Sequence, residues 1–152
     1  MEIPIDYREY QVQNAFCFLV GSTVYQLHQR LLKNFQQAGH DVTFEQWNVL
    51  IQLWSQDGRS QQELAVCTTK NQSYMTRLID VMEERNWVRR TDDSTDRRVK
   101  LVYLTAAGRE LTKTLIELSQ KTLNDALIDI DAEQVAVCRQ VLQAMIANLT
   151  RA

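Results

Sequence analysis

The sequence has little of what usually interrupts a folded domain. Its 152 residues include one proline and four glycines, and 45% of them are hydrophobic and 24% charged. Long disordered linkers are therefore not expected, and the length suits one domain, or a small domain with extra helices that pack elsewhere. The N-terminus has no basic segment followed by an apolar core, and no window approaches about eighteen uninterrupted apolar residues. We expect a cytoplasmic protein with no membrane partner.

Residues that form disulfides, metal sites or catalytic centres are also scarce. Cys17, Cys67 and Cys138 lie far apart without a CxxC motif, and the two histidines, His28 and His40, suit no helical metal pair. The GxSxG, HExxH, P-loop and GxGxxG motifs are missing from the sequence. We therefore expect reduced thiols, no metal, no cofactor and no enzymatic activity.

The net charge of −2 conceals an uneven distribution. Residues 70–100 contain eight Lys/Arg and six Asp/Glu, whereas the segments before and after them are net acidic. Affinity for nucleic acid depends on local neutralisation of phosphates, so an acidic protein can still bind DNA if its basic residues share one face. Residues 70–100 are the candidate for such a face.

Hydrophobic periodicity and capping signals predict a mainly helical chain. Apolar residues at helical spacing predict a helix over residues 12–38 that ends at Gly39. Capping boxes predict four further helix starts, at Thr43, Ser60, Thr69 and Asp131, and the apolar spacing predicts another helix from Thr105. Between the helices, "WVRRTD" and "VKLVYLT" read as two strands flanking the turn "DSTDRR". We expect four helices, a hairpin and two more helices.

The long helices at the two ends of the chain have wider apolar faces than the middle segment could cover. Residues 12–38 and 105–149 both show this surplus. A second copy of the chain, packed helix against helix around a two-fold axis, is the partner that would cover it. We therefore expect a homodimer.

The middle segment has the order of a winged helix-turn-helix. On the helix predicted to end near Arg85, Met75, Leu78, Ile79 and Met82 share one face and polar residues occupy the other. Such a helix enters the DNA major groove, and the hairpin reaches the neighbouring backbone or minor groove. The hairpin's Asp96 and Arg98 can also form an intra-turn ion pair, and at most one of Arg89 and Arg90 is expected to face DNA. The candidate DNA-binding residues are Asn71, Gln72, Ser73, Thr76, Arg77, Asp96, Arg97, Arg98 and Lys100.

The stretch "SYMTRLIDVMEERNWVRRTDDSTDRRVKLVYLTAAGREL" resembles the multiple-antibiotic-resistance regulator (MarR) family of bacterial transcription factors. Asp96 and Arg98 match the family's wing signature, and Thr105 and Gly108 match its entry into the dimerisation helix; Asn86 stands where the family usually has glycine. The resemblance implies a mainly α fold with a small β-hairpin wing (α+β), arranged as dimerisation helix 1–40, winged helix-turn-helix 41–104 and dimerisation helices 105–152. It also implies a homodimer on a pseudo-palindromic DNA operator, usually a repressor, released by a small aromatic effector or by thiol oxidation.

Three function hypotheses from different classes remain open. The leading one is a ligand-responsive regulator, with an effector pocket lined by Tyr25, His28, Trp47 and Trp54, although both tryptophans are expected in the core. The second is a thiol-based sensor that uses Cys17, for which a buried cysteine in apolar surroundings, slow to react, is the competing interpretation. The third is a winged-helix module that binds another protein, which the acidic composition supports.

Overall fold

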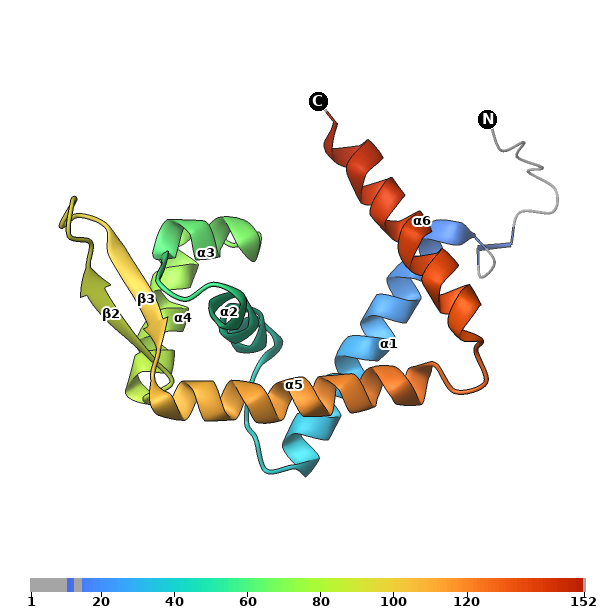
Figure 1. Cartoon of the computed structure of the whole chain (residues 1–152), viewed down its shortest axis with the longest axis horizontal. Coiled ribbons are helices and arrows are strands. Elements are labelled where there is room, and N and C mark those ends of the chain that lie inside the picture. Colours follow the sequence, from blue (N-terminus) through green and yellow to red (C-terminus); the bar gives the residue numbers. More distant parts are fainter. Residues whose placement is uncertain (1–10, 13–14, 152) are drawn as a thin grey trace. The chain divides into compact units, whose positions relative to one another are not determined.

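The computed structural model describes residues 11–12 and 15–151, and divides into a unit up to Thr122 and a second from Leu123 onward. In chain order the elements are α1 (Phe16–Gln37), α2 (Phe44–Ser55), β1 (Arg59–Ser60), α3 (Gln61–Cys67), α4 (Gln72–Glu84), β2 (Val88–Asp92), β3 (Lys100–Leu104), α5 (Ala106–Ala126) and α6 (Ala132–Thr150) (Figure 1). This confirms the predicted mainly α fold with a wing. In the described part of the chain, no helix is long and apolar enough to cross a bilayer.

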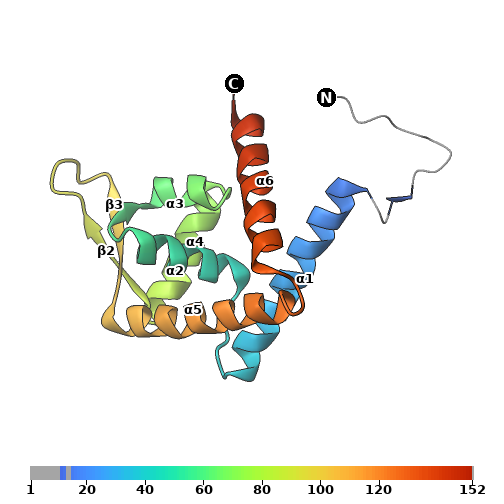
Figure 2. The ribbon, with the colours of Figure 1, turned by 45° about the vertical axis from the view of Figure 1, so that its right-hand side comes forward.

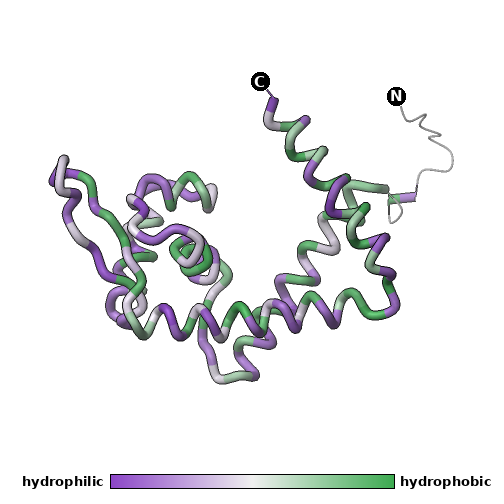
Figure 3. The backbone as a smooth tube through the Cα atoms, in the orientation of Figure 1, coloured by the Kyte–Doolittle hydropathy of each residue, from purple (hydrophilic) through white to green (hydrophobic). Residues whose placement is uncertain are grey.

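The wing is a three-stranded antiparallel sheet in the order β1-β3-β2. Val88 pairs with Leu104 and Arg90 with Val102 across β2 and β3, while the short strand β1 pairs Arg59 with Val102 on the other side. The prediction of a two-stranded hairpin was therefore incomplete. The strand β1 was missed because it is only two residues long and is recognised by its backbone pairing with β3. Figure 2 shows the hairpin of β2 and β3 beside α3 and α4, and Figure 3 shows that β3 is more hydrophobic than the turn before it.

The hydrophobic core of the first unit is built on α2 and α4, with contributions from α1, α3, β2, β3 and α5. The apolar face predicted for α4 is confirmed for Met75, Ile79 and Met82, which are fully buried. On β3, Val102 and Leu104 point into the core, as expected for alternate residues of a strand with one buried face. The core thus fixes which face of α4 and which face of the wing remain exposed.

Two sequence expectations about the terminal helices require correction. The first helix begins at Phe16 rather than at Val12, and only Leu31 and Phe35 of α1 are buried. Cys17, which was expected in a core position, is exposed on the single chain, as are its apolar neighbours Phe16, Phe18 and Leu19. At the other end, Gln134 accepts a hydrogen bond from the backbone N–H of Asp131 at 3.3 Å, as the predicted cap requires.

A close approach of two backbone segments fixes α5 to the end of α4. Asn86 has φ of 57°, the left-handed conformation expected there, and ends the helix. The hydroxyl of Thr105 donates to the carbonyl of Asn86 at 2.6 Å and accepts the N–H of Gly108 at 2.9 Å. A Cβ atom on Gly108 would lie 1.8 Å from the carbonyl oxygen of Trp87. Glycine is therefore required at this position.

Asp57 makes a second connection, from the segment after α2 to the wing and to α5. Its Oδ1 atom accepts the backbone N–H groups of Gly58 at 3.2 Å and Leu104 at 2.9 Å. Its Oδ2 atom accepts from Arg109 Nη2 at 2.6 Å. A half-buried carboxylate with three donors is well satisfied, so this contact holds β3 and the start of α5 together.

We predict that Gly108→Ala lowers the free energy of unfolding by at least about 2 kcal/mol, because α5 must move away from Trp87 to admit the methyl group. Gly21→Ala is the matched control, since a Cβ atom there meets nothing within 4 Å. The control should be neutral or gain about 0.5–1 kcal/mol, as alanine is favoured over glycine inside a helix. Urea unfolding measures both, and equal effects would contradict the close contact.

Candidate nucleic-acid interface

The predicted recognition helix is α4, and its N-terminal cap is Asn71. The side chain of Asn71 accepts the backbone N–H of Tyr74 at 2.8 Å. The predicted capping box at Thr69 is wrong: Thr69 has φ of 53°, whereas a capping residue needs extended backbone. An amide side chain binds adenine through two hydrogen bonds, one to its oxygen and one from its nitrogen. The oxygen of the Asn71 side chain is already engaged in the cap, so Asn71 is not free to make this bidentate contact.

The remaining predicted residues of α4 are all exposed on its outer face. Gln72, Ser73, Thr76 and Arg77 lie in the first two turns, opposite the buried Met75 and Ile79. The structure therefore brings these four predicted residues together on one solvent-accessible face. Gln72 and Arg77 are both exposed, so the carboxamide and the guanidinium are accessible to solvent.

The hydroxyl of Thr76 is held within the protein. It donates to the carbonyl of Gln72 at 3.0 Å, and Gln61 Nε2 donates to it at 3.2 Å. Gln61 belongs to α3, so this contact joins the two helices of the helix-turn-helix. The sequence signal for Thr76 was only its place on a polar face, which did not reveal either partner.

Arg90 on β2 connects the wing to both helices, a role that the sequence did not reveal. Its guanidinium contacts Glu83 Oε2 at 2.5 Å and Asp80 Oδ1 at 2.7 Å, and it donates to Gln61 Oε1 at 2.7 Å and to the carbonyl of Thr76 at 2.9 Å. Its side chain is only 18% exposed. We refer to Gln61, Thr76, Asp80, Glu83 and Arg90 as the Arg90 network. It fixes the positions of α3, α4 and the wing relative to one another.

The neighbouring Arg89 has a different environment. Its guanidinium lies over the ring of Tyr103, 4.7 Å from the centroid. Successive side chains of a strand point to opposite faces, so Arg89 is exposed on the outer face of β2 and Arg90 is partly buried on its inner face. Which of the two arginines faces DNA stays a prediction.

The tip of the wing is organised by acidic residues. Arg98 Nε lies 3.2 Å from Asp96 Oδ1, and the same oxygen accepts the Arg98 backbone N–H at 3.0 Å, which confirms the predicted intra-turn ion pair. Lys100 pairs with Asp92 across the hairpin. Arg97 is exposed on the same turn, and the side chain of Arg98 is 92% exposed. The predicted wing residues thus lie together, with the guanidinium of Arg98 directed to solvent.

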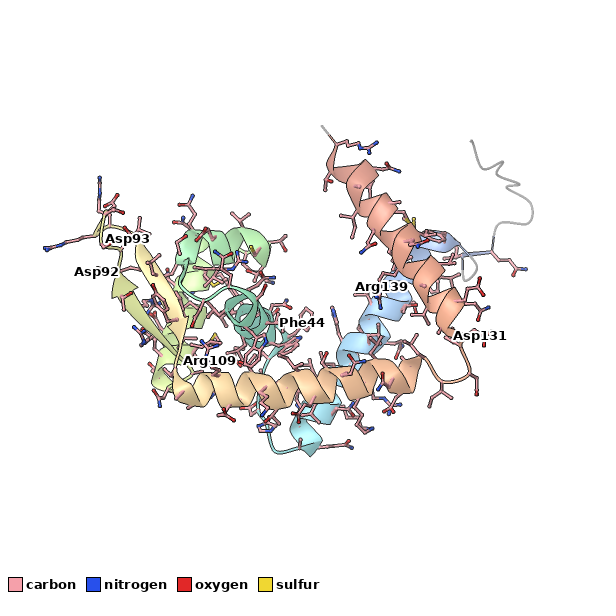
Figure 4. The ribbon with its side chains drawn as sticks, in the orientation of Figure 1. Phe44, Asp92, Asp93, Arg109, Asp131 and Arg139 are labelled. Atoms are coloured by element: carbon pink, nitrogen blue, oxygen red, sulfur yellow. The ribbon has the colours of Figure 1, made fainter. Side chains whose placement is uncertain are left out.

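Asp93 is the organiser of this turn, and the sequence reading missed it. Figure 4 shows Asp92 and Asp93 near the far end of the wing. Asp93 Oδ1 accepts from the hydroxyl and the backbone N–H of Thr95, and from the backbone N–H of Asp96. The bond from the Thr95 hydroxyl, followed by those from the Asp96 and Thr95 backbone, lowers the pKa of Asp93. The ionised Asp93 therefore stabilises the turn at pH values above the ordinary pKa of aspartate. This stabilisation is lost as the pH falls through the lowered pKa of Asp93. Asp followed by Thr two residues later, a common turn pattern, was the available signal.

The four residues predicted to line an effector pocket lie in different surroundings. Trp47 is buried and packs edge-on against Phe35, with ring centroids 5.6 Å apart. His28 packs against Phe44 with ring centroids 3.7 Å apart and the ring planes tilted by 37°, and Tyr25 is exposed on α1. Trp54, which was expected in the core, is exposed and lies beneath the guanidinium of Arg109 at 5.9 Å. The expectation of a core residue was wrong for Trp54, which is 39% exposed at the end of α2.

Comparisons with known proteins identify relatives of this arrangement. Residues 42–100 match the model of the MarR family, a segment that contains α2 to β2 and the wing tip. The transcriptional regulator HosA of Escherichia coli is 26% identical over 120 residues, which cover 79% of this chain and 89% of HosA.

Solved structures share the fold over nearly the whole chain. The transcriptional regulator PA3341 is 30% identical, with a TM-score of 0.77 over 89% of this chain and 98% of PA3341. CouR of Rhodococcus jostii RHA1, in a complex with p-coumaroyl-CoA, is 25% identical, with a TM-score of 0.77 over 90% of this chain and 95% of CouR. The repressor CouR bound to a 23-mer DNA duplex aligns with a TM-score of 0.75 at 22% identity, over 92% of this chain and 95% of CouR.

We predict that Arg90→Ala lowers the free energy of unfolding by about 1–3 kcal/mol, because two carboxylates and the carbonyl of Thr76 lose a partly buried partner. Arg89→Ala is the control and should cost less than about 1 kcal/mol, since it removes only an exposed cation–π contact. Denaturant unfolding with tryptophan fluorescence compares the two variants. If Arg89→Ala proved as destabilising as Arg90→Ala, the network would not have the structural role assigned to it.

Proposed function

The chain is a DNA-binding transcriptional regulator of the MarR family, and we propose that it represses its target genes as a homodimer on a pseudo-palindromic operator. The observation that carries the proposal is the exposed polar face of α4, supported by fully buried Met75, Ile79 and Met82 and joined to a basic wing by Arg90. A rigid helix with a polar outer face fits the major groove of B-DNA. Repression is supported by CouR, which is a repressor with the same fold.

In this proposal α4 supplies the contacts to base edges. Gln72 recognises adenine through its carboxamide, and Arg77 recognises guanine through two guanidinium hydrogen bonds. Ser73 lies between them on the same exposed face and donates to a phosphate. Asn71 contributes by capping the helix, which directs the free backbone N–H groups of the first turn towards the DNA backbone.

The wing supplies contacts that do not depend on sequence. Arg98 is almost fully exposed, yet its Nε atom is tethered to Asp96. An exposed ion pair contributes little stability, but it limits the conformations of the side chain and so reduces the entropy lost on binding. Arg97 and Arg98 would then contact phosphates or the narrow minor groove beside the α4 site. Lys100 is the weaker candidate, because Asp92 already pairs with it.

Homodimer formation is supported by the apolar surface of the terminal helices. On α6, within the second unit, Val137, Val141, Leu142, Ile146 and Leu149 are all exposed. On α1, within the first unit, the exposed apolar residues include Phe16, Phe18 and Leu19. A helix that is apolar on several sides is normally buried, and a second copy of the chain brings the same surfaces in matching positions.

We also propose that a small aromatic effector releases the DNA. Support comes from CouR, whose structure has been solved with p-coumaroyl-CoA. Of the residues predicted to line the pocket, His28 packs against the ring of Phe44 in the first turn of α2, and Tyr25 is accessible one turn earlier on α1. The thiol-sensor alternative through Cys17 stays a prediction, because the thiol is exposed on the single chain but lies in the apolar segment of α1 that the proposed dimer would cover. The protein-interaction alternative is disfavoured by the exposed arginines of the wing.

For the DNA contacts, we predict that Arg77→Ala loses about 1–3 kcal/mol of discrimination at particular base pairs. Arg98→Ala should instead weaken binding to most sequences and reduce the slope of log affinity against log salt by about one. Lys33→Ala, an exposed residue on α1, is the control for loss of one positive charge. Fluorescence anisotropy at several salt concentrations measures all three. Unchanged affinity in both arginine variants, with their unfolding midpoints preserved, would refute the assignment.

For the dimer, we predict that replacing Leu142 and Leu149 with Glu produces monomers, since charged groups would have to be desolvated at a helical interface. Leu149 is 81% exposed on the single chain, so the substitution should not disturb the fold of the protomer. Gln143→Glu introduces a charge on the same helix without removing an apolar side chain and should remain dimeric. Sedimentation velocity at micromolar concentration gives the result, and a monomeric wild-type protein would contradict the proposal.

A further inference from the structure

Thr76 lies at the centre of the exposed face of α4, but its hydroxyl is not available to DNA. That group has one proton, which it donates to the carbonyl of Gln72 at 3.0 Å. A phosphate oxygen or an acceptor on a base needs a donated proton, so the hydroxyl could serve neither without breaking this bond. One acceptor position is also in use, because Gln61 Nε2 donates to the same oxygen at 3.2 Å.

The hydroxyl is held in place by a chain of contacts rather than by one weak bond. Arg90 Nε donates to Gln61 Oε1 at 2.7 Å, which fixes the orientation of the amide. Arg90 is fixed in turn by Glu83 Oε2 at 2.5 Å and Asp80 Oδ1 at 2.7 Å. Since threonine is branched at Cβ, fixing its oxygen also fixes the direction of its methyl group.

Thr76 nevertheless remains an exposed residue. Its free terminal atom is the methyl carbon, at a position between the candidate base-contacting residues Gln72 and Arg77. Among the four bases, only thymine presents an apolar group, its C5 methyl, in the major groove. An oriented methyl group on a recognition helix therefore has one chemical partner on the edge of a base pair.

We propose that Thr76 is a specificity-determining residue that recognises a thymine methyl through its own methyl group, held in position by Gln61 and Arg90. The inference rests on the proposed placement of α4 in the major groove. It assigns Thr76 a contact different from a phosphate contact, and it gives the Arg90 network a second role. The network then positions a base-reading atom as well as stabilising the fold.

The test uses a duplex recovered by the full-length wild-type protein from a random pool, with each thymine replaced in turn by deoxyuridine. This replacement removes only the methyl group. Wild-type protein should lose about fourfold in affinity at one thymine in each half-site, the effect expected for one apolar carbon at about 0.8 kcal/mol. Anisotropy titration at one fixed salt concentration measures the loss.

Two variants separate the methyl group from the hydroxyl. Thr76→Val keeps a methyl and lacks the hydroxyl, so it should retain the deoxyuridine penalty. Thr76→Ser keeps the hydroxyl and lacks the methyl, so it should bind the two duplexes equally, as a double-mutant cycle requires when the contact is lost. Gln61→Leu should reduce the ratio of the affinities for the two duplexes, because threonine in a helix divides between two rotamers and loses the contact that selects one of them, whereas valine has one strongly preferred rotamer and does not need Gln61. Unfolding midpoints identify any variant that fails to fold.

The outcomes distinguish this inference from the proposed function. If wild-type protein binds its duplex and Thr76→Ser retains the full deoxyuridine penalty, the methyl contact is wrong while the DNA-binding proposal stands. If Thr76→Val loses much more affinity than Thr76→Ser, the hydroxyl makes the contact and the inference is overturned. If wild-type protein recovers no duplex at all, both proposals fail.

Discussion

The guanidinium of Arg90 is the interaction on which the DNA-binding part of the molecule depends. Arg90 lies on β2, and its guanidinium contacts four partners on two other elements. These partners are Gln61 on α3 and the carbonyl of Thr76, Asp80 and Glu83 on α4. A planar group with five donors suits this task, whereas lysine would offer a single point of contact. Hydrophobic packing under α4 fixes how closely the helix lies against the core, and the Arg90 network fixes its position relative to the wing. In the proposed complex, α4 and the wing contact different grooves and need such a fixed relation, because a small misplacement of either would lose one set of contacts.

The same principle extends from the wing into α5. Asp57 connects β3 to Arg109, and the contact of Gly108 with Trp87 leaves no room between the start of α5 and the end of α4. Further along α5, Asn34 of α1 donates to the hydroxyl of Thr122 at 2.7 Å. Within the first unit, α5 therefore links the DNA-binding elements to α1.

Local sequence patterns were sufficient for most of the fold and for part of the site. The apolar spacing of Met75, Ile79 and Met82 identified the buried face of α4, and Asn86 was recognised as a helix end because asparagine tolerates positive φ. The cap of α4 was misplaced because Thr69 and Asn71 are both good capping residues, and the turn after α3 decides between them. The strand β1 was missed because two residues carry no periodic signal. The role of Arg90 was also inaccessible, since Gln61 lies 29 residues earlier in the chain. Contacts of that separation depend on the completed fold, and the exposure of Trp54 and, on the single chain, of Cys17 was missed for the same reason.

The central claim is that a dimer of this chain recognises DNA with two copies of α4 and its wing. Selection of bound sequences by full-length protein from a random duplex pool tests it most directly. The account predicts an inverted repeat whose half-sites are separated, centre to centre, by about one helical turn of 10–10.5 base pairs, or a multiple of it. Recovery of a single unrepeated site, or of no enriched sequence at low salt, would contradict it.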